Sequence, residues 1–166
     1  IERANLTLSG FVTDPAGAQD GVVSTHQRFT WQLNLSNTGS AGVEEDTRLE
    51  LDFQGTGYFL DSGLSSQLDT ITIVPGVAYD VTVWTDVVAH GLESITATVV
   101  DTSNDENTNA NAPITPNQLV LSKSIEERAH LQISLTAPAV VDSGQTFNVT
   151  AVVTNIGEAE ITPDSV

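Results

Sequence analysis

The residues best suited to chemistry form an acidic, amide-rich stretch, Asp101 to Asn107. It places the side-chain oxygens of Asp101, Asn104, Asp105 and Glu106 in one short segment. Calcium is a hard cation that coordinates several carboxylate and carbonyl oxygens at once. The segment is not an EF-hand, because the required glycine and terminal glutamate are out of place. These four residues are therefore a candidate calcium site, and a solvated turn without an ion is the interpretation against which it stands.

The charge balance is strongly acidic, with 22 Asp and Glu against five Lys and Arg and a formal net charge of −17. A surface of this sign repels nucleic acid and anionic membranes, and no apolar run approaches a membrane span. We expect neither nucleic-acid binding nor membrane insertion. A second acidic run, Glu44 to Asp46, is a weaker calcium candidate. The chain has no cysteine, so we expect no disulfide and no cysteine-ligated metal.

Enzyme signatures are missing from the sequence. His26, His90 and His130 are isolated, without the spacing of a zinc site, and no serine lies in a nucleophile elbow. Asp-Ser-Gly occurs at 61–63 and 142–144, but in different parts of the two repeats described below, so the triplets are not equivalent halves of an aspartic protease. We predict that the chain is not an enzyme.

The elements that must position these residues are β-strands, and one of them occurs twice, at 29–39 and 147–157. Apolar and polar residues alternate in both copies, which is typical of a strand buried on one face. The predicted buried residues are Phe29, Trp31, Leu33 and Leu35 in the first copy and Phe147, Val149, Ala151 and Val153 in the second. Each copy ends in Asn-x-Gly, a turn signal. The chain is therefore a tandem array.

The repeat boundary is predicted near residue 126, because the start, Ile1 to Leu6, is echoed at Ile125 to Leu131. Alternating segments before that boundary give about seven strands at the spacing of a β-sandwich. We predict an all-β fold, an immunoglobulin-like seven-stranded β-sandwich in tandem: a complete repeat over 1–126 and the N-terminal part of a second over 127–166. The polar segment 101–111 and the insertion around 14–21 are expected to be surface loops, the former burying nothing.

The second copy is too short to close a sandwich. Either further chain or another molecule must supply its missing strands, because a few strands alone would leave unpaired edges.

Three aromatic residues could form a binding surface. Trp31 is predicted to lie in the core, whereas Trp84 lies opposite that face and is either covered by the second repeat or exposed as a platform for sugar or protein. Tyr58 and Tyr79 are the other aromatic residues available to a carbohydrate-binding surface.

Several motifs together resemble the bacterial cell-adhesion-related domain family, CARDB, and its immunoglobulin-like relatives. In the first copy they are residues 4–8, 29–39, Pro75-Gly76, 96–101 and 103–107; in the second copy they are 131–138, 143–145 and 152–157. The resemblance implies a seven-stranded module repeated within large secreted or surface-anchored prokaryotic proteins, with no catalytic residues. The chain differs from the family in its long first inter-strand loop and in the enlarged stretch 54–67. A binding function specific to this chain would lie in these two insertions.

These observations favour a structural or adhesive module of an extracellular or cell-surface protein, acting as spacer or interaction element. Its expected partners are neighbouring repeats, identical subunits, or a cell-surface protein or glycan. Two alternatives stay open: a filament subunit completed by strands of its neighbours, and a carbohydrate-binding accessory module of a secreted hydrolase.

Overall fold

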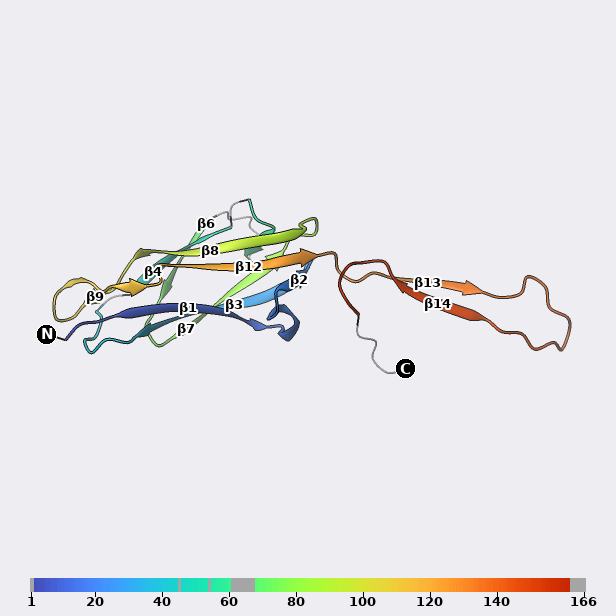
Figure 1. Ribbon diagram of the computed structural model, residues 1–166, viewed down its shortest axis with the longest axis horizontal. Helices are drawn as coiled ribbons and strands as arrows, with labels where there is room; N and C mark the ends of the chain where they lie inside the picture. The colour runs from blue at the N-terminus through green and yellow to red at the C-terminus, as the bar shows by residue number, and fades with distance from the viewer. Residues whose placement is uncertain (1, 45, 54, 61–67, 162–166) are drawn as a thin grey trace. The chain divides into compact units, whose positions relative to one another are not determined.

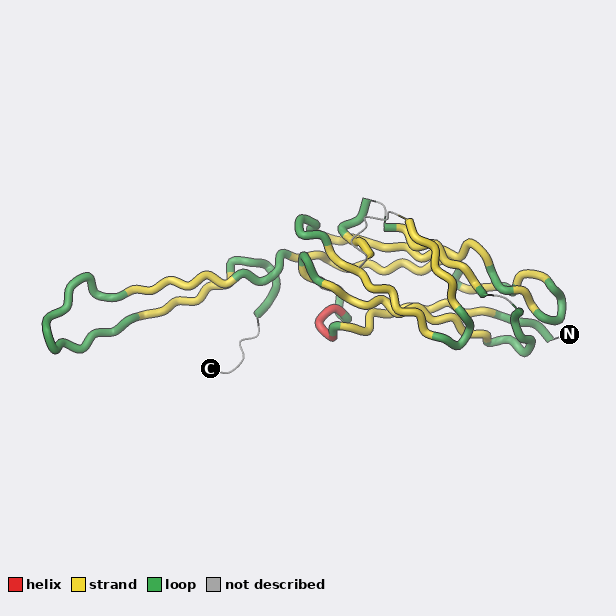
Figure 2. Tube along the Cα trace, turned by 180° about the vertical axis from the view of Figure 1, so that it is seen from behind, coloured by secondary structure: helices red, strands yellow, loops and turns green. Residues whose placement is uncertain are grey.

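Strand-favouring residues and frequent turns give an almost entirely β structure (Figures 1 and 2). The computed structural model describes residues 2–44, 46–53, 55–60 and 68–161. The chain divides into two compact units, Ile1–Glu126 and Glu127–Val166. The described residues contain no helix with the length and the apolar composition that a membrane span requires.

The first sheet of the first unit has the strand order β11-β1-β3-β7-β5. Its strands are β1 (Leu6–Asp14), β3 (Arg28–Asn37), β5 (Tyr58–Leu60), β7 (Ala78–Thr85) and β11 (Ile114–Thr115). The central strand β3 pairs antiparallel with β1 on one side and with β7 on the other. The repeated segment of the sequence is therefore the middle of this sheet.

The second sheet has the order β2-β12-β8-β4-β6 and faces the first. Its strands are β2 (Val22–Ser24), β4 (Thr47–Asp52), β6 (Leu68–Ile73), β8 (Gly91–Asp101) and β12 (Gln118–Glu126). β12 pairs antiparallel with β8 and parallel with the short strand β2. The connection from β1 to β3 thus crosses to the second sheet and back.

The strand order identifies the architecture. In an immunoglobulin sandwich, strands A, B, E and D form one sheet and C, F and G the other. The orders β1-β3-β7-β5 and β4-β8-β12 match these two sheets, with β2, β6 and β11 added at the edges. The predicted all-β, immunoglobulin-like sandwich is confirmed.

The core lies between the two sheets and follows the predicted alternation. Phe29, Trp31, Leu33 and Leu35 are all buried, and the facing sheet contributes Leu49, Leu51, Ile95 and Ala97. Burial of one such aliphatic or aromatic side chain stabilises the fold by about 1.5–3 kcal/mol. Gly10 faces the indole of Trp31: a Cβ added there would lie 2.8 Å from Nε1. Trp31 therefore packs over a backbone position that has no side chain.

Two predicted loops contain regular structure. In the insertion, the short helical turn η1 (Ala16–Ala18), red in Figure 2, buries Ala18. In the polar segment 101–111, β9 (Asn104–Asp105) pairs with β10 (Ala110–Asn111). Ser103 and Asp105 are buried. The expectation that this segment buries nothing is wrong, because its polar groups find hydrogen-bond partners inside the protein.

The second unit contains a hairpin of β13 (Leu131–Thr136) and β14 (Thr150–Asn155). Its register pairs Leu131 with Asn155 and Ile133 with Val153, as Leu6 pairs with Asn37 and Leu8 with Leu35 in the first unit. The predicted burial of its apolar face is wrong for this chain: Phe147 is 47% exposed, and Val149 and Val153 are each 57% exposed. Among the described residues of this unit, no second sheet covers the hairpin.

Candidate functional site

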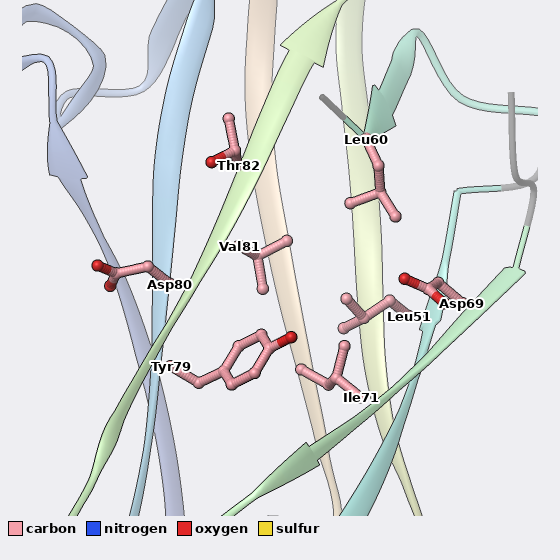
Figure 3. Close-up of a pocket in the computed structure, with 8 residues that line it drawn as sticks. All are labelled: Leu51, Leu60, Asp69, Ile71, Tyr79, Asp80, Val81 and Thr82. Carbon is pink, nitrogen blue, oxygen red and sulfur yellow. The ribbon is translucent and has the colours of Figure 1, made fainter. Parts of the chain in front are cut away.

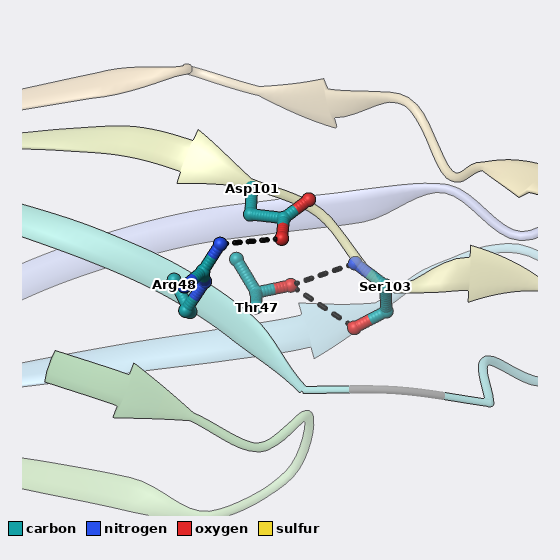
Figure 4. Close-up of polar contacts among 4 residues, drawn as sticks. All are labelled: Thr47, Arg48, Asp101 and Ser103. Carbon is teal, nitrogen blue, oxygen red and sulfur yellow. Dashed lines mark hydrogen bonds and ion pairs between the residues drawn. The ribbon is translucent and has the colours of Figure 1, made fainter.

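The predicted calcium residues lie at one end of the first sandwich, where protein groups already bind them. Asp101 ends β8, and its carboxylate accepts a hydrogen bond of 2.9 Å from the Arg48 guanidinium. Beside this pair, the Thr47 hydroxyl lies 3.1 Å from the Ser103 hydroxyl and accepts from the Ser103 N–H at 3.3 Å (Figure 4). The buried Thr47–Ser103 contact joins β4 to the segment that leads into β9.

Asp105 is a buried carboxylate with both oxygens engaged. Oδ2 accepts from the N–H of Ala4 at 2.7 Å, and Oδ1 accepts from the N–H of Asn107 at 2.9 Å. The hydrogen bond from Ala4 is the main reason that the pKa of Asp105 lies below its usual range, and the Asn107 bond and the charge of Arg3 act in the same direction. Asp105 thus ties the N-terminal segment to the β9–β10 hairpin.

The other two predicted ligands are fixed through their backbone. The Asn104 carbonyl accepts from the Glu44 N–H at 3.0 Å, and the Glu106 N–H donates to the Gly42 carbonyl at 3.2 Å. Among the described residues, no three His, Asp or Glu side chains cluster closely enough to hold a metal ion. Calcium at Asp101, Asn104, Asp105 and Glu106 stays a prediction, and binding would have to compete with these contacts. The second candidate, 44–46, includes Glu45, which lies outside the described residues.

The aromatic residues do not form a shared platform. Tyr58 is only 4% exposed, and its hydroxyl donates to the Lys123 carbonyl at 3.1 Å. Burial, with the Glu93 carboxylate nearby, raises the pKa of Tyr58 above its usual value. The expectation that Tyr58 is available to a sugar is therefore wrong. Trp84 is half-buried beside His26, with 5.7 Å between the ring centroids, while Tyr79 is partly exposed on the same strand.

Lys123 is a buried cation that the sequence reasoning missed. It points inward from β12, and its ammonium group donates to the backbone carbonyl of Asp20. Burial lowers the pKa of Lys123, while the Asp20 carboxylate opposes that shift. Lys123 therefore attaches the loop that follows β1 to the strand β12. Its position in the alternation of Leu119, Leu121 and Ile125 was a signal that could have found it.

A groove of about 250 Å³ lies between the two sheets, on the side of the edge strands β5 and β6 (Figure 3). It is lined by Leu51, Leu60, Asp69, Ile71, Tyr79, Asp80, Val81 and Thr82. Figure 3 shows the side chains of Tyr79 and Val81 on the groove side of β7 and those of Asp80 and Thr82 on its other side. The sequence does not predict the groove, because its lining residues come from four strands in two different sheets, β4, β5, β6 and β7. Of the enlarged stretch 54–67, Gln54 and residues 61–67, including the first Asp-Ser-Gly triplet, lie outside the described residues.

The asparagine of the Asn-x-Gly motif makes the same three side-chain hydrogen bonds in both units, and we call this set of contacts the clasp. In the first, Oδ1 of Asn37 accepts from the N–H groups of Asn5 and Gly39, and its amide donates to the Ala41 carbonyl. In the second, Oδ1 of Asn155 accepts from His130 and Gly157, and its amide donates to the Ala159 carbonyl. Gly39 and Gly157 each lie against the backbone carbonyl of an arginine, Arg3 and Arg128, where a Cβ would clash. The two hairpins are thus closed by equivalent contacts.

Comparison with known proteins adds structural neighbours only. No family model and no curated protein matches the sequence. A crystal structure of the CARDB domain of the PF1109 protein from Pyrococcus furiosus, in complex with di-metal ions, is 20% identical over 75% of this chain and 93% of that one, with a TM-score of 0.40. The solution structure of that domain is 21% identical, over 75% and 97%, with a TM-score of 0.42.

A cohesin module from a family 33 glycoside hydrolase of Clostridium perfringens is 11% identical over 77% of this chain and all of that one, with a TM-score of 0.43. CARDB domains are thus among the structures that this chain is similar to, as its sequence motifs predict. The fold assignment itself rests on the strand order described above.

Proposed function

We propose that this protein is a structural or adhesive repeat module of a large secreted or surface-attached prokaryotic protein, acting as a spacer or interaction element. The observation that carries the proposal is the duplicated hairpin. The second unit repeats the β1–β3 register of the first, and Asn155 repeats the clasp of Asn37. A chain that begins the same sandwich again is organised as an array.

The composition supports this role. The complete sandwich of the first unit encloses its own apolar core. Because the formal net charge is −17, neighbouring modules repel each other and stay extended and soluble. In such an array the partners of a module are the adjacent repeats, and the setting is extracellular or on the cell surface.

A filament subunit is the second candidate, and the exposed apolar face of the β13–β14 hairpin favours it. In the first unit, the equivalent face is buried under the second sheet. Strands supplied by a neighbouring molecule could cover it in the same way.

Sedimentation velocity over a range of protein concentrations separates the two candidates, first with calcium and then with a chelator. A monomer at every concentration supports the spacer, and growth with concentration supports the filament. A matched pair of variants identifies the surface. Val153→Lys places a charge on the apolar face and should abolish growth, whereas Val152→Lys, on the other face of β14 with similar exposure, should not. Assembly or compaction that requires calcium would instead support the predicted metal site.

A further inference from the structure

The strand β1 leaves a short stretch of its outer edge open at Ser9, Gly10 and Phe11. Among the described residues, the outer neighbour β11 pairs with β1 only at its start, and all three residues of the stretch are exposed, Phe11 by 53%. The strands that border the undescribed residues 61–67, β5 and β6, lie at the edges of the two sheets away from β1 and β12. The stretch has no charged residue and no proline, which commonly protect an edge strand. It can therefore accept another strand.

Gly10 points both of its backbone groups toward this open side. In an antiparallel pair, the N–H and C=O groups of successive residues point alternately to one neighbour and then to the other. Leu6 donates its N–H to the Pro113 carbonyl at 2.8 Å, on the side away from β3. The register with β3 runs without a shift from Leu6 to Val12, so Gly10, an even number of residues after Leu6, has the same orientation. An added strand could thus exchange hydrogen bonds with the N–H and the C=O of Gly10.

Beneath Gly10 lies an indole N–H without a protein acceptor. The Trp31 side chain is only 1% exposed, and its Nε1 lies 2.8 Å from the position that a Cβ of Gly10 would occupy. In the described part of the chain, no group accepts a hydrogen bond from this N–H, and the one fully enclosed side-chain polar atom without a partner is Oγ1 of Thr108. The Trp31 nitrogen therefore reaches solvent beside Gly10, which has no side chain to cover it. A donor in this position favours a ligand that brings an acceptor.

The surroundings of this N–H define the side chain that it would bind. A residue directly opposite Gly10 on an added strand points its side chain to the same, inward side of the sheet. There it meets the Trp31 N–H and the half-buried Leu119, whose Cδ1 lies 3.2 Å from the same Cβ position. Threonine offers a hydroxyl to the donor and a methyl group to the leucine, whereas the net charge of −17 disfavours a carboxylate. The residues before and after it would point outward, where the exposed Phe11 ring favours apolar side chains.

We propose that the β1 edge at Gly10 binds an extended peptide segment of a partner protein in which a threonine stands between two apolar residues. The backbone of the segment pairs with Gly10, the threonine hydroxyl accepts from the Trp31 N–H, and the apolar side chains contact Phe11. A second copy of β1 does not fit this site, because its inward-facing residues are apolar or glycine. This inference concerns the first unit alone and does not depend on the proposed array.

NMR titration of the full chain with the capped peptide Gln-Val-Thr-Val-Gln tests the proposal. This sequence is the same in both directions, so it can pair either way. We expect saturable shifts of the Gly10 amide and of the Trp31 indole N–H, because both groups gain an acceptor. The indole N–H of Trp84, on another strand, is the internal control and should keep its position. Shifts that are absent, or that leave Gly10 and Trp31 unaffected, would overturn the proposal.

A matched peptide, Gln-Val-Val-Val-Gln, tests the threonine in the unaltered protein, because valine has nearly the same shape without the hydroxyl. It should bind about twofold to tenfold more weakly, the range that one hydrogen bond contributes. Trp31→Phe removes the indole N–H and should make the two peptides bind equally. Phe11→Ala is the control variant and should weaken both peptides while their ratio stays the same. If the unaltered protein binds the two peptides equally, Trp31 does not recognise the threonine and the proposal fails.

Discussion

At the scale of single residues, the core of the first unit depends on Gly10 and Trp31 together. The second copy has other residues at both of these positions. Gly10 leaves the space that the Trp31 indole fills. The repeat register aligns Gly10 with Leu135 and Trp31 with Val149. Where the large aromatic residue becomes a valine, the glycine has become a leucine. The side-chain volume that is lost at the tryptophan position is thus partly regained at the glycine position on the neighbouring strand.

Gly10→Ala should destabilise the first unit by about 1–3 kcal/mol, because the added methyl group meets Nε1 of Trp31 and must displace a fully buried indole. Equilibrium urea unfolding, followed by tryptophan fluorescence, measures the change. Gly17→Ala is the control, because a Cβ at Gly17 meets no atom within 4 Å. Equal stabilities of the two variants would contradict the packing argument.

Asp105 should make the stability of the first unit depend on pH in the acid range. Its folded pKa lies below the unfolded value of about 3.9. The ionised group therefore stabilises the fold at pH values above the unfolded pKa, and this contribution is lost as the pH falls through the folded pKa. Thermal melts from neutral to acid pH should show a deficit for Asp105→Asn that is largest at neutral pH and shrinks below about pH 4.

Asp101→Asn serves as the comparison for that series. It removes a half-exposed ion pair with Arg48, and such pairs contribute about 0–1 kcal/mol. The loss of stability in Asp105→Asn could instead be independent of pH, or no larger than that in Asp101→Asn. Either result would show that the negative charge of Asp105 does not stabilise the attachment of the N-terminal segment.

At the scale of elements, alternation along the sequence predicts the long strands because each has one apolar face. β3 and β12 are examples in which nearly every inward position is apolar. The β9–β10 hairpin could not be predicted in this way, because it is held by polar contacts between distant segments: Asp105 binds the N–H of Ala4, 101 positions earlier. The groove likewise could not be predicted, because periodicity along one strand does not show how residues of β4, β5, β6 and β7 meet between two sheets.

The clasp that closes each hairpin should carry measurable stability. Asn37→Ala leaves the N–H groups of Asn5 and Gly39 and the Ala41 carbonyl without their side-chain partner, which should cost about 1–3 kcal/mol. Chemical denaturation compares this variant with Asn34→Ala, an outward-facing change in the same strand that should cost far less. A clasp variant as stable as Asn34→Ala would show that the shared contacts of the two units are energetically unimportant.

At the scale of the whole molecule, acidic side chains outnumber basic ones, 22 to five, and their repulsion opposes the folded state. Raising the salt concentration from about 0.01 M to about 1 M shortens the Debye length from ~30 Å to ~3 Å. The melting temperature should therefore rise with sodium chloride over this range. A melting temperature that falls instead would mean that attractive ion pairs such as Arg48–Asp101 outweigh the repulsion.

The central claim is that the second unit is an incomplete copy of the first, and hydrogen–deuterium exchange of the dilute monomer tests it most directly. β3 and β14 occupy equivalent positions, but among the residues that the structure describes only β3 is covered by a second sheet and flanked by a further strand. The amides of 150–155 should therefore exchange far faster than those of 28–37, because an isolated hairpin opens easily. Protection of 150–155 equal to that of β3 in the monomer would contradict the account, since the hairpin would then be a finished element and not the beginning of another sandwich.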